Sequence, residues 1–251
     1  VSAYNGFKGI TIQNTDNIDM SSNSNWTPIG TNENPFCGTI DGQNKLLKNI
    51  TVNRTNHNSG LFGVLNCAKI KNIKLTGRVK SNTLYVGGFC GRTKGTAIDS
   101  VKFENCHFNG TIEGSSYYIG GIVGYTGTYC IIENCSAGGN ITSTSQNCAG
   151  IVGVASGTRI SNCINIAEVK ATNYAGGIVG SANNATTKIL NCLNAGNIYG
   201  TSEYTGGIVS YIGASQVKYC INTGTVSGGG SIIGVASGTP KIKKNYYDNQ
   251  R

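Results

Sequence analysis

Two glutamates at equivalent places in a repeated phrase are the side chains that could do acid–base chemistry. Glu104 and Glu133 each stand two residues before a cysteine. If the repeats stack, the two carboxylates lie about 4.8 Å apart, and a retaining glycosidase needs carboxyl groups about 5–5.5 Å apart. Any stacked repeat produces this spacing, so the alternative is a surface column whose charge is offset by bases such as Lys71 and Lys102. We expect no catalytic residue, with a carbohydrate-active enzyme as the alternative.

Cysteine is the other reactive residue that recurs. Five of the 10 cysteines follow one another at steps of 29, 28, 29 and 28 residues: Cys106, Cys135, Cys163, Cys192 and Cys220. In one column, neighbours could form disulfides, but free cysteine is also a favoured buried residue, and both states remain open. The sequence has no Cys-x-x-Cys motif and only two histidines, His57 and His107, so we expect no metal site and no cofactor. Because Cys106 and His107 are adjacent on a strand, they face opposite sides and cannot form a catalytic couple.

These residues are positioned by a phrase that recurs along the chain: glycine, two apolar residues, glycine. It begins at Gly60 and returns with steps of 28, 33, 29, 27, 30 and 24 residues. The last two copies each have serine in place of one glycine. A period of this length indicates a solenoid, a propeller or an array. Glycine permits corners and close backbone approach, so the first apolar residue of each copy can point into a narrow core. The predicted core column is Leu61, Phe89, Ile122, Ile151, Ile178, Ile208 and Ile232.

Each repeat contains three strand-like parts, which favours a parallel β-helix. The glycine phrase is followed by an apolar stretch ending in Asn-Cys, and then by a Gly-x-apolar piece such as Gly110-Thr111-Ile112. No segment has the 3.6-residue period of a helix, and a propeller blade needs about 40 residues. We therefore predict an all-β parallel β-helix, or β-solenoid, with about 28–30 residues per coil and roughly seven to eight coils. A right-handed coil is expected, as for nearly all parallel crossovers.

The asparagine before each recurring cysteine is predicted to form a corner. On a straight strand the cysteines would share a face with Glu104 and Glu133, which need water. A bend at the asparagine turns the thiol inward, and asparagine tolerates the left-handed conformation that a bend requires. The predicted asparagine ladder is Asn105, Asn134, Asn162 and Asn191, beside the column of thiols.

The chain divides by pattern into three parts. Residues 1–35 do not repeat and are predicted to be an N-terminal capping segment, which shields the first coil from edge-to-edge pairing. Residues 36–240 form the repeat solenoid, and residues 241–251 form a closing strand or cap. Within this last part, Asn245-Tyr246 looks like a final Asn-Cys phrase in which tyrosine replaces cysteine.

Two sets of side chains are candidates for surface roles. The first consists of Asn-x-Ser/Thr sites, which carry glycans if the chain is secreted from a eukaryote; they are Asn25, Asn49, Asn53, Asn109, Asn140 and Asn184. Asn134 also satisfies the motif but is expected to stay bare in the ladder. The second set consists of four tyrosines, each three residues before a copy of the glycine phrase: Tyr85, Tyr118, Tyr174 and Tyr204. These tyrosines could line one rim and contact a glycan or a partner protein through their rings. The alternative is that they pack as ordinary turn residues.

The opening of the repeat region resembles a known family. Trp26-Thr27-Pro28-Ile29-Gly30 is followed by Phe36-Cys37-Gly38-Thr39-Ile40-Asp41-Gly42, an apolar strand, and Gly60-Leu61-Phe62-Gly63. This succession, with the later Gly-Ile-Val-Gly copies, is similar to GLUG-motif domains across essentially the whole chain. Members of that family occur in large cell-surface and secreted proteins, including adhesins and the repeat regions of some immunoglobulin-A proteases. The resemblance implies a mostly non-catalytic module of an extracellular protein.

Charge and hydropathy complete the prediction. The formal net charge is +9, which favours acidic partners such as anionic glycans, or simply a solvated surface. No apolar run approaches the roughly 18 residues of a membrane span. We predict a structural or adhesive extracellular rod whose partner is a host or matrix protein or a glycan, with no nucleic-acid binding and no membrane insertion. End-to-end or lateral self-assembly into filaments is an alternative, because exposed strand edges template pairing.

Overall fold

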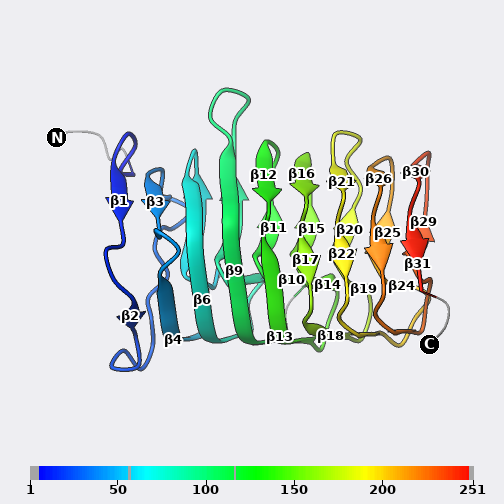
Figure 1. Cartoon of the computed structure of the whole chain (residues 1–251), viewed down its shortest axis with the longest axis horizontal. Helices are drawn as coiled ribbons and strands as arrows, with labels where there is room; N and C mark the ends of the chain where they lie inside the picture. The colour runs from blue at the N-terminus through cyan, green and yellow to red at the C-terminus, as the bar shows by residue number, and fades with distance from the viewer. Residues whose placement is uncertain (1–5, 56–57, 116, 249–251) are drawn as a thin grey trace.

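The computed structural model describes residues 6–55, 58–115 and 117–248. Its strands stack as about eight turns of a parallel β-solenoid, which lie side by side from the N-terminal to the C-terminal end (Figure 1). The predicted fold class is therefore confirmed. Within the described residues there is no helix of the length and apolar character needed to cross a bilayer.

The turns contribute strands to three sheets, and the middle turns contribute to all three. The largest sheet has 19 strands and two sectors that meet at the asparagine bend. Its first sector contains β1 (Thr11–Gln13), β3 (Thr39–Asp41), β12 (Cys130–Glu133), β16 (Thr158–Ser161), β21 (Lys188–Leu190), β26 (Gln216–Lys218) and β30 (Lys241–Lys243). Its second sector contains β2 (Ile18–Asp19), β4 (Leu46–Arg54), β13 (Ser136–Ser143), β17 (Ile164–Asn165), β18 (Glu168–Ala171), β22 (Leu193–Asn194), β23 (Ile198–Tyr199), β27 (Ile221–Asn222), β28 (Val226–Ser227) and β31 (Tyr246–Tyr247). Two long strands, β6 (Lys69–Ser81) and β9 (Val101–Gly114), run through both sectors.

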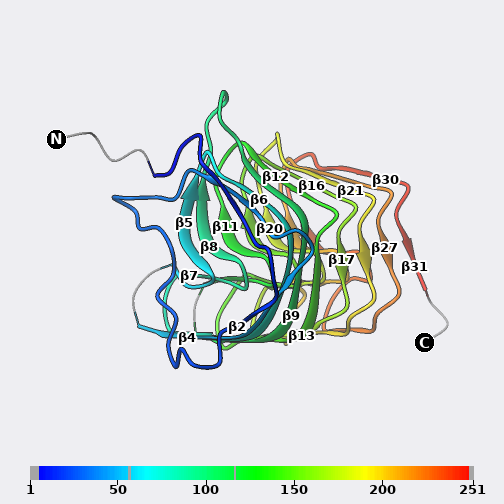
Figure 2. The same cartoon turned by 60° about the vertical axis from the view of Figure 1, so that its left-hand side comes forward.

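The other two sheets flank the glycine phrase. The seven-stranded sheet consists of β5 (Phe62–Asn66), β8 (Cys90–Lys94), β11 (Val123–Thr126), β15 (Val152–Ala155), β20 (Val179–Ala182), β25 (Val209–Ile212) and β29 (Ile233–Ala236). The five-stranded sheet consists of β7 (Tyr85–Gly87), β10 (Tyr118–Gly120), β14 (Cys148–Ala149), β19 (Ala175–Gly176) and β24 (Thr205–Gly206). Viewed obliquely, the turns form nested loops of similar outline (Figure 2).

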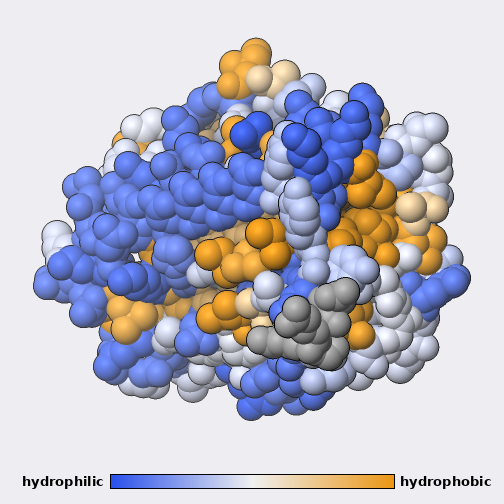
Figure 3. All heavy atoms as spheres, turned by 45° about the vertical axis from the view of Figure 1, so that its right-hand side comes forward, coloured by the Kyte–Doolittle hydropathy of each residue, from blue (hydrophilic) through white to orange (hydrophobic). Residues whose placement is uncertain are grey.

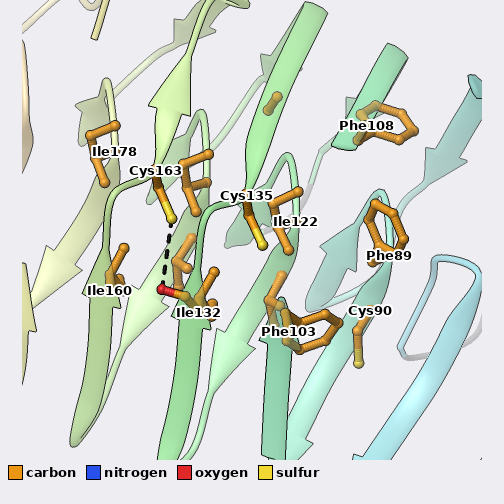
Figure 4. Packing of buried hydrophobic residues seen from close by; sticks show 14 of the residues in the cluster. Phe89, Cys90, Phe103, Phe108, Ile122, Ile132, Cys135, Ile160, Cys163 and Ile178 are labelled. Carbon is orange, nitrogen blue, oxygen red and sulfur yellow. Dashed lines mark hydrogen bonds between the residues drawn. The ribbon is translucent and has the colours of Figure 1, made fainter. Parts of the chain in front are cut away.

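The predicted core column lies at the corner between these two sheets. The backbone amide of Ile122 donates to the carbonyl of Ile151 at 3.0 Å, and Ile151 donates to Ile178 at 3.2 Å. The column residues are buried from Leu61 to Ile208, whereas Ile232 is only half-buried because it belongs to the last turn. Phenylalanines occupy the core of the first turns, where Phe89, Phe103 and Phe108 lie close together, and isoleucines replace them further along (Figure 4).

The first glycine of the phrase has a packing reason. A Cβ on Gly177 would lie 2.5 Å from Cγ of Asn194 and 2.0 Å from the carbonyl oxygen of Gly207. A Cβ on Gly121 would likewise lie 2.5 Å from the Cβ of Ala137. The corner therefore passes too close to the opposite sheet for any side chain, which is why the phrase keeps its glycine.

The two ends of the solenoid differ. At the N-terminal end, Trp26 packs against the core and its indole Nε1 donates to the carbonyl of Leu61 at 2.9 Å. Lys8 reaches a loop several turns away and pairs with Asp99 at 2.8 Å. At the C-terminal end, β29 is half-buried to exposed, and β30 and β31 are exposed. The division into cap, solenoid and closing segment stays a prediction.

The last turn corrects one expectation from the sequence. Lys243 pairs with Lys218 and Tyr246 pairs with Ile221, so Asn245, not Tyr246, stands opposite Cys220. The side-chain oxygen of Asn245 accepts a hydrogen bond from the Cys220 amide at 2.9 Å. The motif was misplaced by one residue because Lys244, with φ of 53°, takes the bend position that asparagine holds in earlier turns.

Candidate functional surfaces

The asparagine bend sets which side chains face the interior. The four asparagines of the predicted ladder have left-handed backbones: Asn105, Asn134, Asn162 and Asn191, with φ between 51° and 54°. Each following cysteine is buried. Figure 4 shows Cys135 and Cys163 directed into the core, where the Cys163 thiol donates to the carbonyl of Ile132 at 3.7 Å. The bend therefore places carboxylates outside and thiols inside on the same short segment.

The buried thiols are in an unreactive environment. All 10 cysteines are free, and each ladder thiol also donates to the carbonyl two residues earlier, as Cys135 does to Glu133 at 3.2 Å. Burial raises the pKa of the Cys135 and Cys163 thiols well above the ordinary range. Because the thiolate is the reactive form, this column is suited to packing.

A second asparagine ladder is buried inside the solenoid, and the sequence analysis missed it. Asn165 donates to Asn194 at 2.7 Å, and Asn194 donates to Asn222 at 2.7 Å. All three are at most 2% exposed. Each side-chain nitrogen also donates to a carbonyl of its own turn, as Asn194 does to Gly196 at 2.9 Å. The available signal was the phrase Cys-x-Asn, which occurs three times in succession.

The two candidate catalytic glutamates do lie side by side. Glu104 and Glu133 pair directly in the register of β9 and β12. Lys102 lies between the two carboxylates, with its Nζ 3.0 Å from Glu104 and 2.6 Å from Glu133. Hydrogen bonding to Glu133, and then to Glu104, raises the pKa of Lys102. The charge of Lys102 is thus shared by both carboxylates, whereas Lys71 pairs with Asp41. The contact with Lys102 agrees with the surface-column alternative, and the absence of a catalytic residue stays a prediction.

The four predicted rim tyrosines form two clusters. Tyr85 and Tyr118 stack with ring centroids 5.4 Å apart, and Tyr125 lies within 5.8 Å of both. The guanidinium of Arg92 lies 5.4 Å from the Tyr85 ring, which adds a cation–π contact.

The second tyrosine cluster lies two turns away. Tyr174 and Tyr204 have centroids 4.5 Å apart, and Tyr211 lies 6.1 Å from Tyr174. Asn147 takes the column position between Tyr118 and Tyr174, since its carbonyl accepts from Ile119 and the next residue donates to Tyr174. The rim therefore presents two aromatic clusters separated by one turn without a tyrosine.

A row of cations crosses the C-terminal half of the large sheet. Arg159 pairs with Lys188 in the register of β16 and β21, and Lys188 continues through Gln216 to Lys241. The neighbouring row contains Lys218 and Lys243. We call this group the basic rows: Arg159, Lys188, Lys218, Lys241, Lys243 and Lys244. Among the described residues these six make no ion pair, in contrast to Lys71 and Lys102 on earlier turns. Viewed toward the C-terminal end, a hydrophilic band runs along the turns above apolar side chains (Figure 3).

The candidate glycosylation sites differ in accessibility. Asn109 and Asn140 are exposed on the second sector of the large sheet. The side-chain nitrogens of three others are already hydrogen-bond donors: Asn25 to Asn53, Asn49 to Asp19, and Asn184 to Ser156. Asn53 is exposed beside Asn25, and Asn134 is exposed at the bend. Because the amide nitrogen is the atom that is glycosylated, Asn109 and Asn140 are the most accessible positions.

Among the described residues, no group of three or more His, Cys, Asp or Glu side chains is placed to hold a metal ion. His107 is half-buried and its Nδ1 lies 2.9 Å from the Ser136 hydroxyl. Burial, then the charge of Lys74, lowers the pKa of His107. His57 lies outside the described residues.

These features define a parallel β-solenoid of short repeats with half-buried tyrosine clusters and basic groups at its surface. Residues 115–142 match the family model described as the GLUG motif, so the resemblance noted in the sequence is confirmed there. The fold is similar to a crystal structure from Bacteroides ovatus described as a "putative immunoglobulin A1 protease", with a TM-score of 0.69 and 22% identity. The match covers 95% of this chain and 77% of that one, and shows a shared fold. A comparison with curated proteins gives no match.

Proposed function

We propose that this chain is a non-catalytic extracellular module, a stiff rod that presents a binding surface for a glycan. The observation that carries the proposal is the pair of half-buried tyrosine clusters at the surface, fixed in register over a continuous buried core. Because strand pairing positions every turn, the two clusters keep a constant separation and need no ordering upon binding. Such preorganisation favours recognition of a repeating ligand.

The chemistry of the clusters supports a carbohydrate. Tyrosine rings offer an apolar face and a hydroxyl group, which suits sugars, since these have apolar faces and polar edges. Tyr118 and Tyr174 lie two turns apart, which corresponds to about 9–10 Å at the usual strand spacing. The intervening Asn147 has a smaller side chain that is largely buried, so the turn between the two clusters has no aromatic ring at this position of the column.

The basic rows favour an anionic glycan over a neutral one. Their six cations lie on the C-terminal half of the rod, in rows interrupted at Gln216, and make no ion pair within the described residues. Rows of uncompensated charge attract a linear polyanion and raise its rate of association.

A glycan array with the purified chain tests this proposal. We expect sulfated or carboxylated polysaccharides to bind. Tyr118→Ala or Tyr174→Ala should each lower affinity by about threefold to tenfold, the equivalent of roughly 0.5–1.5 kcal/mol. Tyr129→Ala is the matched control, because Tyr129 is exposed outside the clusters. Equal losses in all three variants, or no glycan bound above background, would overturn the proposal.

The contribution of charge is tested separately. Lys188→Glu combined with Lys218→Glu should abolish binding of the anionic glycan, whereas Lys48→Ala, at the opposite end and paired with Asp19, should leave it unchanged. Binding by wild type should weaken as salt concentration rises. A glycan interaction that is insensitive to both salt and the double reversal would leave the tyrosine clusters as the binding surface and remove the basic rows from it.

End-to-end assembly is a second proposal, supported by the exposed ends. Phe7, Ile10 and Ile12 are 41–52% exposed at one end, and Ile242 and Tyr246 are 40% and 61% exposed at the other. Because β1 and β30 belong to the same sector and run in the same direction, one copy could continue the sheet of another. Sedimentation velocity should show oligomers that grow with concentration and are lost with Ile242→Lys. A concentration-independent monomer would contradict this.

A further inference from the structure

Two cysteines outside the ladder face each other near the N-terminal end. Strand β3 pairs with β6 so that Thr39 lies opposite Lys69, whereas Phe36 lies opposite Leu65. The later turn therefore has one extra residue between these two pairings, and Cys37 lies beside Asn66 and Cys67. Hydrogen bonds hold the backbone on both sides of the pair, from Asn66 to Phe36 at 2.9 Å and from Lys69 to Gly38 at 3.1 Å. The two residues are therefore neighbours on consecutive turns.

The environment of this pair differs from that of the other eight cysteines. Cys37 and Cys67 are only partly buried, whereas the remaining eight are buried. Burial, and then the nearby Cys67 thiol, raises the pKa of the Cys37 thiol. Thiols in the Cys106–Cys220 ladder also lie near one another, but they face the closed core, where a soluble oxidant has no access.

We propose that Cys37 and Cys67 form a disulfide when the protein meets an oxidising thiol–disulfide buffer, and that the ladder cysteines stay reduced. Adjacent strands of a sheet are about 4.8 Å apart, which lies inside the Cα separation of 4.4–6.8 Å that disulfides require. The cross-link joins two consecutive turns, so it needs no change in the register of β3 and β6.

The chemistry balances with glutathione disulfide as the oxidant. The thiolate of one cysteine attacks a sulfur of glutathione disulfide, forms a mixed disulfide and releases one glutathione thiolate. The thiolate of the other cysteine then attacks the protein sulfur of that mixed disulfide and displaces the second glutathione. Two protein thiols are oxidised, glutathione disulfide is reduced to two glutathione molecules, and the two protons from the cysteines pass to them.

The cross-link would secure the start of the rod. The amide of Cys37 donates to Gly6 at 2.6 Å, so the chain entering the first turn is attached at the same place. A disulfide here closes the segment between residues 37 and 67 into a loop. The loop lowers the conformational entropy of the unfolded chain and so favours the folded turns. This inference goes beyond the proposed glycan binding and does not depend on it.

Peptide mapping of the full chain tests the proposal. The protein is equilibrated with glutathione disulfide, quenched with acid, denatured, alkylated and digested with trypsin without reduction. Cleavage after lysine and arginine places Cys37 in residues 9–45 and Cys67 in residues 55–69. We expect one cross-linked species of these two peptides, with the other eight cysteines alkylated. Alkylation of both Cys37 and Cys67, or a cross-link involving the ladder, would overturn the proposal.

Matched variants separate the cross-link from general effects of cysteine loss. Cys67→Ser should leave Cys37 as a stable mixed disulfide with glutathione, whereas Cys192→Ala should retain the Cys37–Cys67 cross-link. Oxidation should raise the urea midpoint of wild type and of Cys192→Ala and leave that of Cys67→Ser unchanged. A midpoint that responds to oxidation equally in all three proteins would contradict the assignment even if a cross-linked peptide is found.

Discussion

Asn194 occupies the middle of the buried asparagine ladder and receives one hydrogen bond while donating others. Asn194→Ala leaves the amide of Asn165 and the acceptor oxygen of Asn222 without their partner in the core. Leaving buried polar groups unsatisfied costs about 1–3 kcal/mol. We expect a lower urea midpoint for Asn194→Ala, measured by circular dichroism.

The control for this variant is Asn140→Ala, because Asn140 is exposed in β13 of the same sheet. That change should alter the free energy of unfolding by no more than about 0.5 kcal/mol, as for most surface substitutions. If both variants unfold at the wild-type midpoint, the ladder contributes no net stability.

Asp41 gives the stability of the N-terminal turns a dependence on pH. Burial opposes its ionisation, but hydrogen bonds from Asn72 and the amide of Gln43 outweigh it, with help from Lys71, so the pKa of Asp41 is lowered. A carboxyl group with a lowered folded-state pKa stabilises above its unfolded pKa, about 3.9, and loses this as pH falls through the folded value. We expect the stability gap between wild type and Asp41→Asn to shrink from roughly pH 5 to pH 2.

Urea titrations at several pH values measure that gap. Asp16→Asn serves as the control, since Asp16 is exposed and its variant should follow wild type throughout. A gap for Asp41→Asn that is independent of pH would show that its loss acts through packing rather than through charge.

At the residue scale, the outer asparagines were predictable and the inner ones were not. The conflict between a carboxylate and a thiol two residues apart pointed to a bend at Asn134. Nothing comparable marked Asn165, whose burial depends on the missing side chain of Gly150, where a Cβ would lie 2.2 Å from the Asn165 Cγ. The burial of a polar residue is decided by a segment that is distant in sequence, and one repeat read alone does not reveal it.

The bend is the element on which the large sheet turns. Asn162 has φ of 54°, a conformation that costs most residues about 1–2 kcal/mol. The free energy of unfolding of Asn162→Gly, measured by urea titration, should stay within about 1 kcal/mol of wild type. Asn162→Val should be less stable than wild type by about 1–2 kcal/mol. Asn140→Val, in the extended strand β13, is expected to be neutral. Equal midpoints for the glycine and valine variants would show that the bend relaxes.

Strands of the repeat were predicted where apolar residues alternate with polar ones. The five-stranded sheet was not predicted, because β14, β19 and β24 have two residues each and contain alanine, glycine, threonine and cysteine. Strands this short have no period of their own. They exist because the turns above and below present aligned carbonyl and amide groups.

At the scale of the whole molecule, stability should vary along the rod. Residues 119–182 contain many fully buried side chains, whereas β29 is half-buried to exposed and β30 and β31 are exposed. In a solenoid each turn is stabilised chiefly by its neighbours, and end turns open most easily. Hydrogen–deuterium exchange should therefore be fastest in residues 233–247 and slowest in residues 119–182. Uniform exchange along the chain would indicate a single cooperative unit.

The overall fold could be predicted because one repeating phrase constrains every turn in the same way. The surface could not be predicted to the same degree. The two tyrosine clusters depend on which turn lacks the aromatic residue, and the basic rows depend on how each turn pairs its charges. Such features differ from turn to turn, so the pattern that all the turns share does not predict them.

Register between turns of similar length has a consequence for how such a molecule can vary. Thr126 lies opposite Ala155, so a chain lacking residues 127–155 would join Thr126 to Ser156, place Ile122 beside Ile178 and bring Tyr118 and Tyr174 onto consecutive turns. In every other column, the residues on the two sides of the deletion would likewise become neighbours. The reach of the rod can therefore be lengthened or shortened in whole steps of about 4.8 Å, with the tyrosine clusters moved nearer or further apart while the architecture is retained.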